Sequence, residues 1–296
     1  MNNTITSAYV QQFHDSFVDA AQQEESRLVA TITNRGGVTG TSFTANDMGT
    51  IEVSQVTNRY GDTEWTIPDA GVRQALMADY DVAIPIDKFD LPKLLANPQG
   101  QYLKHAMAGM HRKEDAVVFS ALLGSALRKT SDTGSYSGVT LASYASGQQV
   151  IAAGGTAFTK AKIIQARKLF RKNESDSHNS EELFIAYNSE MLDDVLSDTT
   201  LTSADYMAVK MLQEGDVSRK WCGFTWVPYE AITASGGTAT TAAWTRSSLH
   251  FGYGMEITTD IGPRRDKRNL TQIYVAMSLG AVRVNEQKVV SISFTY

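Results

Sequence analysis

The sequence predicts an α+β fold in which one long helix joins a β region near the N-terminus to a mixed α/β region and a strand-rich end. Residues 97–129 carry apolar side chains at the three- and four-residue spacing of an amphipathic helix. Within residues 51–86 and 273–294, apolar and polar side chains alternate with the two-residue period of strands. A helix of about 30 residues would be ~45 Å long and would act as a beam between these regions.

The N-terminal part is predicted to be an arm. Residues 6–30 show a helical pattern whose apolar face includes Tyr9, Phe13 and Phe17. This amphipathic arm would pack either on its own subunit or on a neighbouring one.

A projecting β excursion is expected next. Alternating runs at 51–54 and 80–87 flank a turn-rich stretch, and Pro85 suits only a sheet edge or a strand end. A two-stranded ribbon is marginally stable alone in water, so it needs its own body or a neighbouring subunit to lie on.

The long helix has a defined start and an interrupted stripe. Asn97 is a preferred N-cap, and Pro98 suits the first helical position, where its missing N–H costs nothing. The charged segment 111–115 (HRKED) interrupts the apolar stripe midway. That stripe comprises Leu103, Met107, Met110, Val117, Val118, Ala121 and Leu122.

A mixed α/β region follows a Gly-, Ser- and Thr-rich boundary at 130–155, which includes a short strand near 139–141. The expected buried face of its first helix is Ile163, Ile164, Ala166, Leu169 and Phe170. In order, we expect a helix at 158–172, a strand at 183–187, helices at 190–196 and 204–213 capped by Ser189 and Ser203, a strand at 221–227 and a Gly/Thr/Ala-rich excursion at 233–243. Residues 249–296 are then almost entirely strand, around a turn at 262–269 (GPRRDKRN).

Composition excludes several classes of protein. A net charge of −5, from 27 basic and 32 acidic residues, gives no general attraction to nucleic acid, so a dedicated DNA-binding protein is disfavoured. Cys222 is the only cysteine, which excludes an intrachain disulfide and a multi-cysteine metal site and fits a reducing cytoplasm. No apolar run of about 18 residues and no signal peptide is present, so we expect neither a membrane partner nor export.

No pattern of residues argues for catalysis. His111 and Asp115 share a helix face at i, i+4 and could form a base with its orienting carboxylate, or two metal ligands. The alternative, which we favour, is a polar segment of the helix that faces solvent, the interior of an assembly or an adjacent subunit. The sequence has no nucleophile elbow, Walker loop or complete dinucleotide fingerprint, so we predict no catalytic, cofactor or metal site.

Several charged and aromatic residues are candidates for subunit contacts. A basic cluster in the C-terminal turn could contact nucleic acid, but Asp266 interrupts it and no aromatic residue interleaves it for base stacking. A hairpin tip that pairs with acidic residues of a neighbour is favoured. Trp65, on the β excursion, is either an interface anchor or folded back on its own strand. The full set of interface candidates is Tyr9, Phe13, Phe17, Arg59, Trp65, Arg73, Arg264, Arg265, Lys267 and Arg268.

The order of these elements resembles the major capsid proteins of tailed phages with the Hong Kong 97-type fold. Two stretches carry the resemblance most clearly, VAIPIDKFDL before the long helix and LGAVRVNEQKVV near the C-terminus. The resemblance implies an N-terminal arm at 1–34, an extended β loop at 35–85, a peripheral domain with a spine helix at 86–149, an axial domain at 150–248 and peripheral return strands at 249–296, of which 287–296 could instead join the axial sheet.

The resemblance also implies a function and partners. Subunits of this family form hexamers and pentamers of an icosahedral shell, which assembles as a procapsid in the host bacterial cytoplasm, matures, and encloses double-stranded DNA without reading its sequence. A portal protein would complete such a virion. In the family, the hairpin that matches residues 262–269 meets neighbours near local threefold axes.

The sequence departs from the family pattern in two ways, and each departure predicts a property of the shell or its assembly. Some members lock the shell through a lysine of the extended loop, but residues 35–85 contain no lysine, so we expect noncovalent stabilisation or a cementing protein. No long scaffolding segment precedes the arm, so we expect a separate scaffolding protein. The alternatives are an encapsulin-like cargo shell and, from a different class, an orphan α+β hydrolase or ligand-binding protein.

Overall fold

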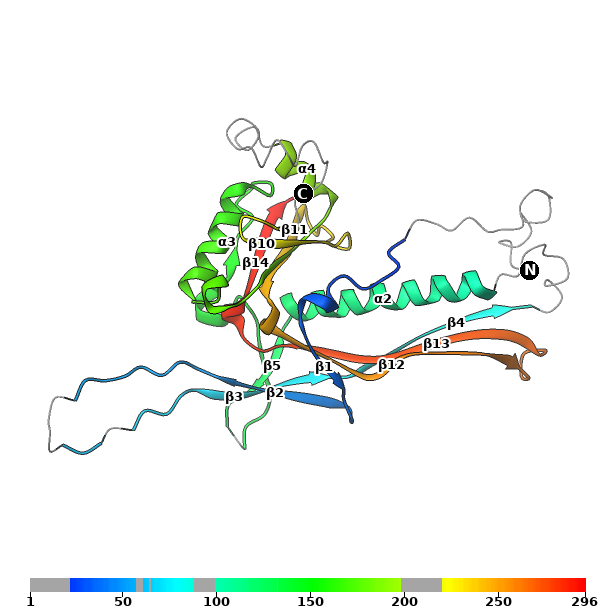
Figure 1. The fold of residues 1–296 in the computed structure, drawn as a ribbon, viewed down its shortest axis with the longest axis horizontal. Coiled ribbons are helices and arrows are strands. Elements are labelled where there is room, and N and C mark those ends of the chain that lie inside the picture. Colours follow the sequence, from blue (N-terminus) through cyan, green and yellow to red (C-terminus); the bar gives the residue numbers. More distant parts are fainter. Residues whose placement is uncertain (1–21, 57–60, 64, 88–98, 132, 198–219) are drawn as a thin grey trace.

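A computed structural model describes residues 22–56, 61–63, 65–87, 99–131, 133–197 and 220–296. Within this part the strands form three sheets, with the orders β1-β12-β13-β4 (the long sheet), β7-β14-β11-β8-β10-β9 (the six-stranded sheet) and β2-β3-β5-β6 (the loop sheet). Figure 1 shows helix α2 lying along the long sheet, with the six-stranded sheet at one end. None of the described helices is long and apolar enough to cross a membrane.

The long sheet is built on the hairpin of β12 (Leu249–Arg264) and β13 (Leu270–Arg283), which pair antiparallel. β4 (Ala78–Ile86) extends it on one side of the hairpin, and β1 (Thr33–Gly37) runs parallel to β12 on the other. β4 is an edge strand in which Pro85 lies opposite Gln272, so the prediction of an edge position is confirmed.

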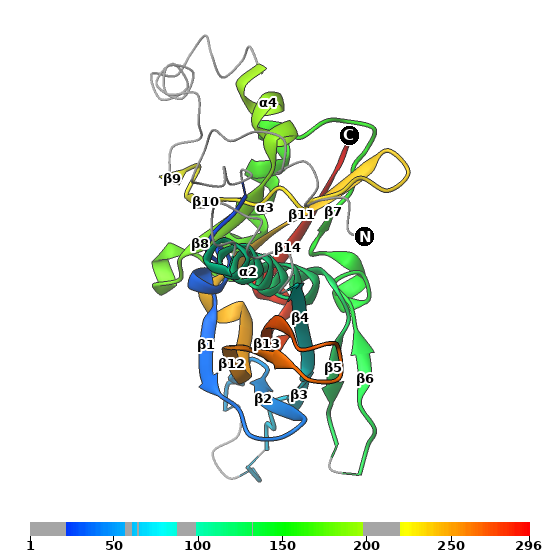
Figure 2. The same cartoon turned by 90° about the vertical axis from the view of Figure 1, so that its right-hand side faces the viewer.

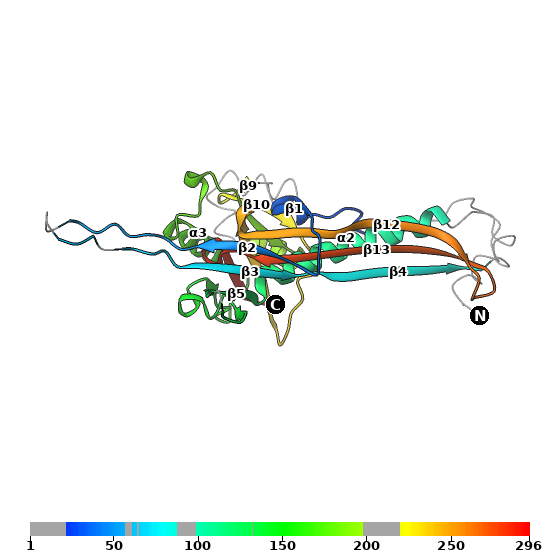
Figure 3. The same ribbon diagram turned by 90° about the horizontal axis from the view of Figure 1, so that it is seen from below.

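The two alternating runs do not form one excursion, as the sequence had suggested. The excursion is made by β2 (Ser42–Met48) and β3 (Ala70–Leu76), whereas β4 pairs with β13 in a different sheet. The alternation at Ile51 and Val53 was wrongly interpreted as a strand, since these residues follow β2 as irregular chain and their side chains are 55% and 96% exposed. Figure 3 shows this excursion and the β12–β13 turn projecting from opposite ends of the molecule.

Helix α2 (Gln99–Leu123) ends earlier than the predicted residue 129. A side chain at Gly124 would place its Cβ 2.6 Å from the Ser120 carbonyl oxygen, so the chain leaves the helix at a residue without one. The loop-sheet strands β5 (Ala126–Lys129) and β6 (Ser137–Val139) follow. The predicted start at Asn97 and Pro98 lies outside the described residues.

The six-stranded sheet confirms the mixed α/β region. Its strands are β7 (Val150–Ile151), β8 (Leu183–Tyr187), β9 (Lys220–Trp221), β10 (Phe224–Pro228), β11 (Thr238–Thr245) and β14 (Val289–Thr295), and its helices are α3 (Lys160–Lys172) and α4 (Ser189–Ser197). Because β14 pairs with β11 and β7, the chain end belongs to this sheet and not to the long one.

Three local predictions in this region are wrong. Residues 238–243 of the predicted excursion form part of β11, a central strand that pairs with β14 on one side and β8 on the other. Ile164 of α3 is 54% exposed rather than buried. Asn188, not Ser189, caps α4, because its Oδ1 accepts the Met191 N–H at 3.0 Å. The predicted helix at 204–213 lies outside the described residues.

One core joins the helix to both large sheets. Met110 and Val118 of α2 belong to the same buried cluster as Ile273 of β13 and Trp244 of β11. Figure 2, which looks along α2, shows β1 and β4 on either side below the helix. The helix therefore fixes the position of the six-stranded sheet relative to the long sheet.

Candidate functional site

Asp115, in the middle of α2, binds residues 23–28 near the start of the described chain. Asp115 is fully buried, and its carboxylate accepts hydrogen bonds from Ser26 Oγ at 2.7 Å, from the Leu28 N–H at 3.0 Å and from the Arg27 N–H at 3.1 Å. Gln23 Nε2 donates a further bond at 2.5 Å. A buried carboxylate is costly unless it is hydrogen-bonded, and here the donors come from residues 23–28. Asp115 therefore clamps the base of the arm onto the helix.

The neighbouring Glu114 faces the long sheet. It is 2% exposed and accepts hydrogen bonds from the Tyr253 hydroxyl of β12 at 3.0 Å and from His111 Nδ1 at 3.0 Å. Burial, together with the charge of Glu114, raises the pKa of Tyr253 above its ordinary value. The expectation that 111–115 is a polar segment facing outward is thus wrong for its two acids, and His111 pairs with Glu114 instead of Asp115.

Replacing His111 by alanine should leave assembly nearly unchanged. The imidazole is 25% exposed, and Glu114 keeps the hydrogen bond from the Tyr253 hydroxyl. We therefore expect the free energy of unfolding to fall by about 1 kcal/mol or less. Asp115→Asn should be far more damaging, because an amide nitrogen in place of Oδ2 cannot accept the hydrogen bonds from Gln23 Nε2 and the Arg27 N–H, and the negative charge that these donors face is lost. Thermal unfolding and limited proteolysis near residues 22–28 would compare the two. Equal losses of stability for His111→Ala and Asp115→Asn would contradict the proposal that Asp115 holds residues 23–28 on the helix.

A second buried cluster lies where the excursion leaves the body. This charged junction consists of Asp47, Arg73, Arg128, Arg283 and Glu286. Arg73 Nη1 and Nη2 donate to the two carboxylate oxygens of Glu286 at 2.5 and 2.7 Å, and its Nε donates to Asp47 Oδ2 at 3.0 Å. The same oxygen accepts from Arg128 Nε at 2.9 Å. Strands β2, β3 and β5 are thereby connected to the turn before β14.

The charged junction corrects one prediction. Arg73 is 2% exposed and uses its guanidinium inside its own subunit, so it is not a subunit contact. Burial acts to raise the pKa of Glu286, but the hydrogen bond and charge of Arg73 outweigh it and hold the pKa below its ordinary value. Glu286 is therefore ionised at neutral pH, and its charge is matched by the arginines beside it.

Arg283 links the junction to the end of α2. Its Nη1 donates to the carbonyl oxygens of Leu122 and Gly124, both at 2.8 Å, and its Nε lies 3.5 Å from Glu286 Oε1. The last carbonyls of a helix lack intrahelical partners, and the helix dipole favours a cation there. One ion-pair network thus runs from the spine helix to the base of the excursion.

Beyond the loop sheet the excursion exposes large apolar side chains. Trp65 is 90% exposed, and nothing in the described chain covers it, so it is not folded back on its own strand. Several large apolar side chains exposed on one projecting segment are typical of an interaction surface. The other large apolar side chains exposed here are Met48, Ile51, Val53, Val56 and Ile67. Arg59, like Tyr9, Phe13 and Phe17 of the arm, lies outside the described residues.

The β12–β13 turn carries the basic cluster to the opposite end. Arg264 is satisfied locally, because its Nε and Nη2 donate to the two carboxylate oxygens of Asp266 at 2.8 and 2.7 Å. This hydrogen bonding lowers the pKa of Asp266 to about 2. Within the described residues, no ion pair involves Arg265, Lys267 or Arg268, which are exposed. Three cations are therefore free to meet an acidic partner.

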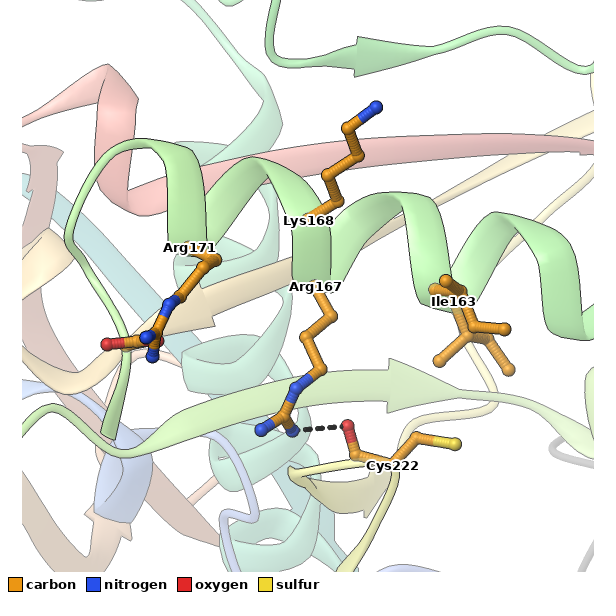
Figure 4. Close-up of a pocket in the computed structure, with 7 residues that line it drawn as sticks. Ile163, Arg167, Lys168, Arg171 and Cys222 are labelled. Carbon is orange, nitrogen blue, oxygen red and sulfur yellow. Dashed lines mark hydrogen bonds and ion pairs between the residues drawn. The ribbon is translucent and has the colours of Figure 1, made fainter. Parts of the chain in front are cut away.

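A hollow on the six-stranded side is lined by α3 and the β9–β10 turn (Figure 4). Arg167 Nη1 already donates to the Cys222 carbonyl oxygen at 2.6 Å, and Arg171 Nη1 pairs with Asp176 at 2.8 Å. Two of its cations are thus satisfied by the chain itself. In the described part of the chain, no group of three or more His, Cys, Asp or Glu residues is placed to hold a metal ion.

The architecture has two segments that project from opposite ends of the molecule. A family model described as phage capsid protein matches residues 5–296, almost the whole chain. The chain belongs to the phage capsid protein family. As such it is a structural protein of the virion, a phage capsid protein. Comparison with curated protein sequences finds no significant match.

Solved structures confirm the predicted Hong Kong 97-type fold for this capsid protein. A structure from Mycobacterium phage Che8 has a TM-score of 0.67 at 12% identity, over 95% of this chain and 96% of that one. The capsid of a native GTA particle has a TM-score of 0.69 at 12% identity, covering 97% and 95%. The capsid of cyanophage P-SCSP1u has a TM-score of 0.67 at 14% identity, covering 99% and 95%.

Proposed function

We propose that this capsid protein forms the hexamers and pentamers of a shell that encloses double-stranded DNA, through contacts made by its two projecting ends. The observation that carries the proposal is the exposed apolar excursion around Trp65. A side chain of this size buries a large area when covered and is enriched among the residues that dominate interfaces. A neighbouring subunit is the proposed cover.

The turn at the opposite end would make an electrostatic contact. Arg265, Lys267 and Arg268 meet acidic residues of adjacent subunits in this proposal, as expected for a hairpin near a local threefold axis. Exposed charges steer association and set register more than they add affinity. The net charge of −5 would leave DNA free to move during filling, without binding to its sequence.

Further partners complete the proposal. A separate scaffolding protein would set the curvature of the procapsid in the host cytoplasm, and a portal protein would occupy one vertex. Because residues 35–85 contain no lysine, the mature shell would be held by noncovalent contacts or by a cementing protein. The chain itself would act without catalytic activity.

Replacing Trp65 by serine should raise the protein concentration needed for assembly by about tenfold or more, because about 1.4 kcal/mol of lost contact energy corresponds to tenfold in an equilibrium constant. Light scattering against concentration measures this threshold. Trp65→Phe is the matched control, since it keeps an aromatic ring and should assemble near the wild-type threshold. Unchanged assembly of Trp65→Ser would rule out the excursion as a contact.

A further inference from the structure

A groove runs between α2 and the edge strand β4. It has a volume of about 550 Å³, and its apolar lining comes from both walls. Charged side chains line the rims, Asp79 and Asp81 on the strand and Arg112 and Lys113 on the helix. The apolar residues are Tyr80, Val82, Ile84, Ala106 and Met110. This lining suits an amphipathic segment that brings apolar side chains inward and charged ones outward.

The described chain begins at the rim of this groove. Gln22 Nε2 donates to His105 Nδ1 at 2.5 Å, and Arg112 Nη1 donates to Gln22 Oε1 at 2.9 Å. Both His105 and Arg112 line the groove. Two residues further on, Glu24 pairs with Lys104 of the same helix at 2.7 Å. The described chain therefore starts beside the groove, with Gln22 and Glu24 bound to the helix.

The sequence of that segment matches the groove in polarity and charge. Tyr9, Phe13 and Phe17 recur every four residues, which places them on one face of a helix. Residues 1–26 contain four carboxylates and no lysine or arginine, whereas the helix rim carries Arg112 and Lys113. The sequence of this segment is thus acidic and amphipathic, and the apolar groove has a basic rim on the helix side and an acidic rim on the strand side.

We propose that the apolar face of Tyr9, Phe13 and Phe17 occupies the groove between α2 and β4 of the same chain. Its carboxylates then lie toward the basic rim of α2. The hydrogen bonds of Gln22 close the connection between the segment and the described arm. The arm is then a part of the subunit's own body, in contrast to an arm that leaves it for a neighbour.

Disulfide trapping in the full-length chain tests this assignment. In a Cys222→Ser background, Phe13→Cys is combined with Val82→Cys on the strand wall or with Gly109→Cys on the helix wall. Mild oxidation should give an intrachain disulfide with at least one wall, seen by peptide mass spectrometry at monomer mass. The matched control is Gln11→Cys, which lies on the opposite face of the same helical pattern and should form several times less disulfide.

Three results of the trapping experiment would overturn the proposal. Covalent dimers would show that the groove takes the arm of a second copy and would overturn the proposal, as would equal trapping of Gln11→Cys and Phe13→Cys. Absence of any disulfide from variants whose circular dichroism matches that of the parent would overturn it as well. Because the readout is a bond within one chain, it does not depend on whether shells form.

Discussion

Shells should be lost when Ala108 is replaced by proline. Ala108 lies in the middle of α2 and is 1% exposed. Proline there removes the hydrogen bond to the residue 104 carbonyl and clashes with that carbonyl, at a cost of about 3 kcal/mol or more. A kink at this point would also misplace the six-stranded sheet relative to the long sheet. Electron microscopy and sedimentation of the variant would show no closed particles.

The matched control for this variant is Ala108→Gly. Glycine costs about 1 kcal/mol in a helix interior but keeps the N–H and the straight axis. It should therefore assemble, at somewhat reduced thermal stability. If Ala108→Pro also gave closed shells, α2 would not be the rigid beam that the fold suggests.

Replacing Arg73 by methionine should strongly destabilise the subunit. The variant leaves the buried carboxylate of Glu286 with only the longer contact from Arg283 at 3.5 Å, and breaking a buried ion pair in this way costs about 3–5 kcal/mol. We expect the unfolding temperature of the unassembled protein to fall by roughly 5–10 °C. The excursion should also be cleaved faster by protease, because its base is no longer tied to the body.

Arg128→Met provides the comparison, since Arg128 also pairs with Asp47. Its side chain is 20% exposed, and the side chain of its second partner Asp69 is 69% exposed. We therefore expect the free energy of unfolding to fall by about 1 kcal/mol. Asp47 would still be bound by Arg73. Equal losses for Arg73→Met and Arg128→Met would contradict the central role of the Arg73–Glu286 pair.

The elements that sequence predicted well are those with a one-sided apolar pattern. Large apolar side chains recur at every second position, Tyr80, Val82 and Ile84, and the strand that this spacing indicates is present. Its partner was not predictable, because alternation identifies the buried face and says nothing about which strand lies beside it. β4 pairs with β13, far away in the sequence, so the extent of the excursion was misjudged.

The charged junction could not be predicted for a related reason. Arg73 points inward on β3 between Gly71 and Ala75, whose small side chains give no apolar alternation. Its partners Asp47 and Glu286 lie 26 and 213 residues away in the sequence, so no local residue spacing could predict the ion-pair network. A single arginine is usually solvated, and only the fold shows that this one is buried.

The structure shows that the excursion and the β12–β13 turn project from the molecule, and their role as contact surfaces stays a prediction. A turn with four cations and an aromatic residue on a long excursion both indicated contact surfaces. The structure adds that Arg264 is paired with Asp266, which leaves Arg265, Lys267 and Arg268 as the exposed cations. It also adds that Trp65 is almost fully exposed, which sequence alone left undecided.

The most direct test of the central claim is electron microscopy of the purified full-length chain after negative staining, over a range of salt concentrations. We expect assembly into curved particles much larger than a subunit, which are irregular in size when the chain is expressed without a scaffolding protein. Uniform shells from the chain alone would keep the capsid assignment and overturn the proposed need for a scaffold. A monodisperse monomer under every condition would contradict shell formation itself.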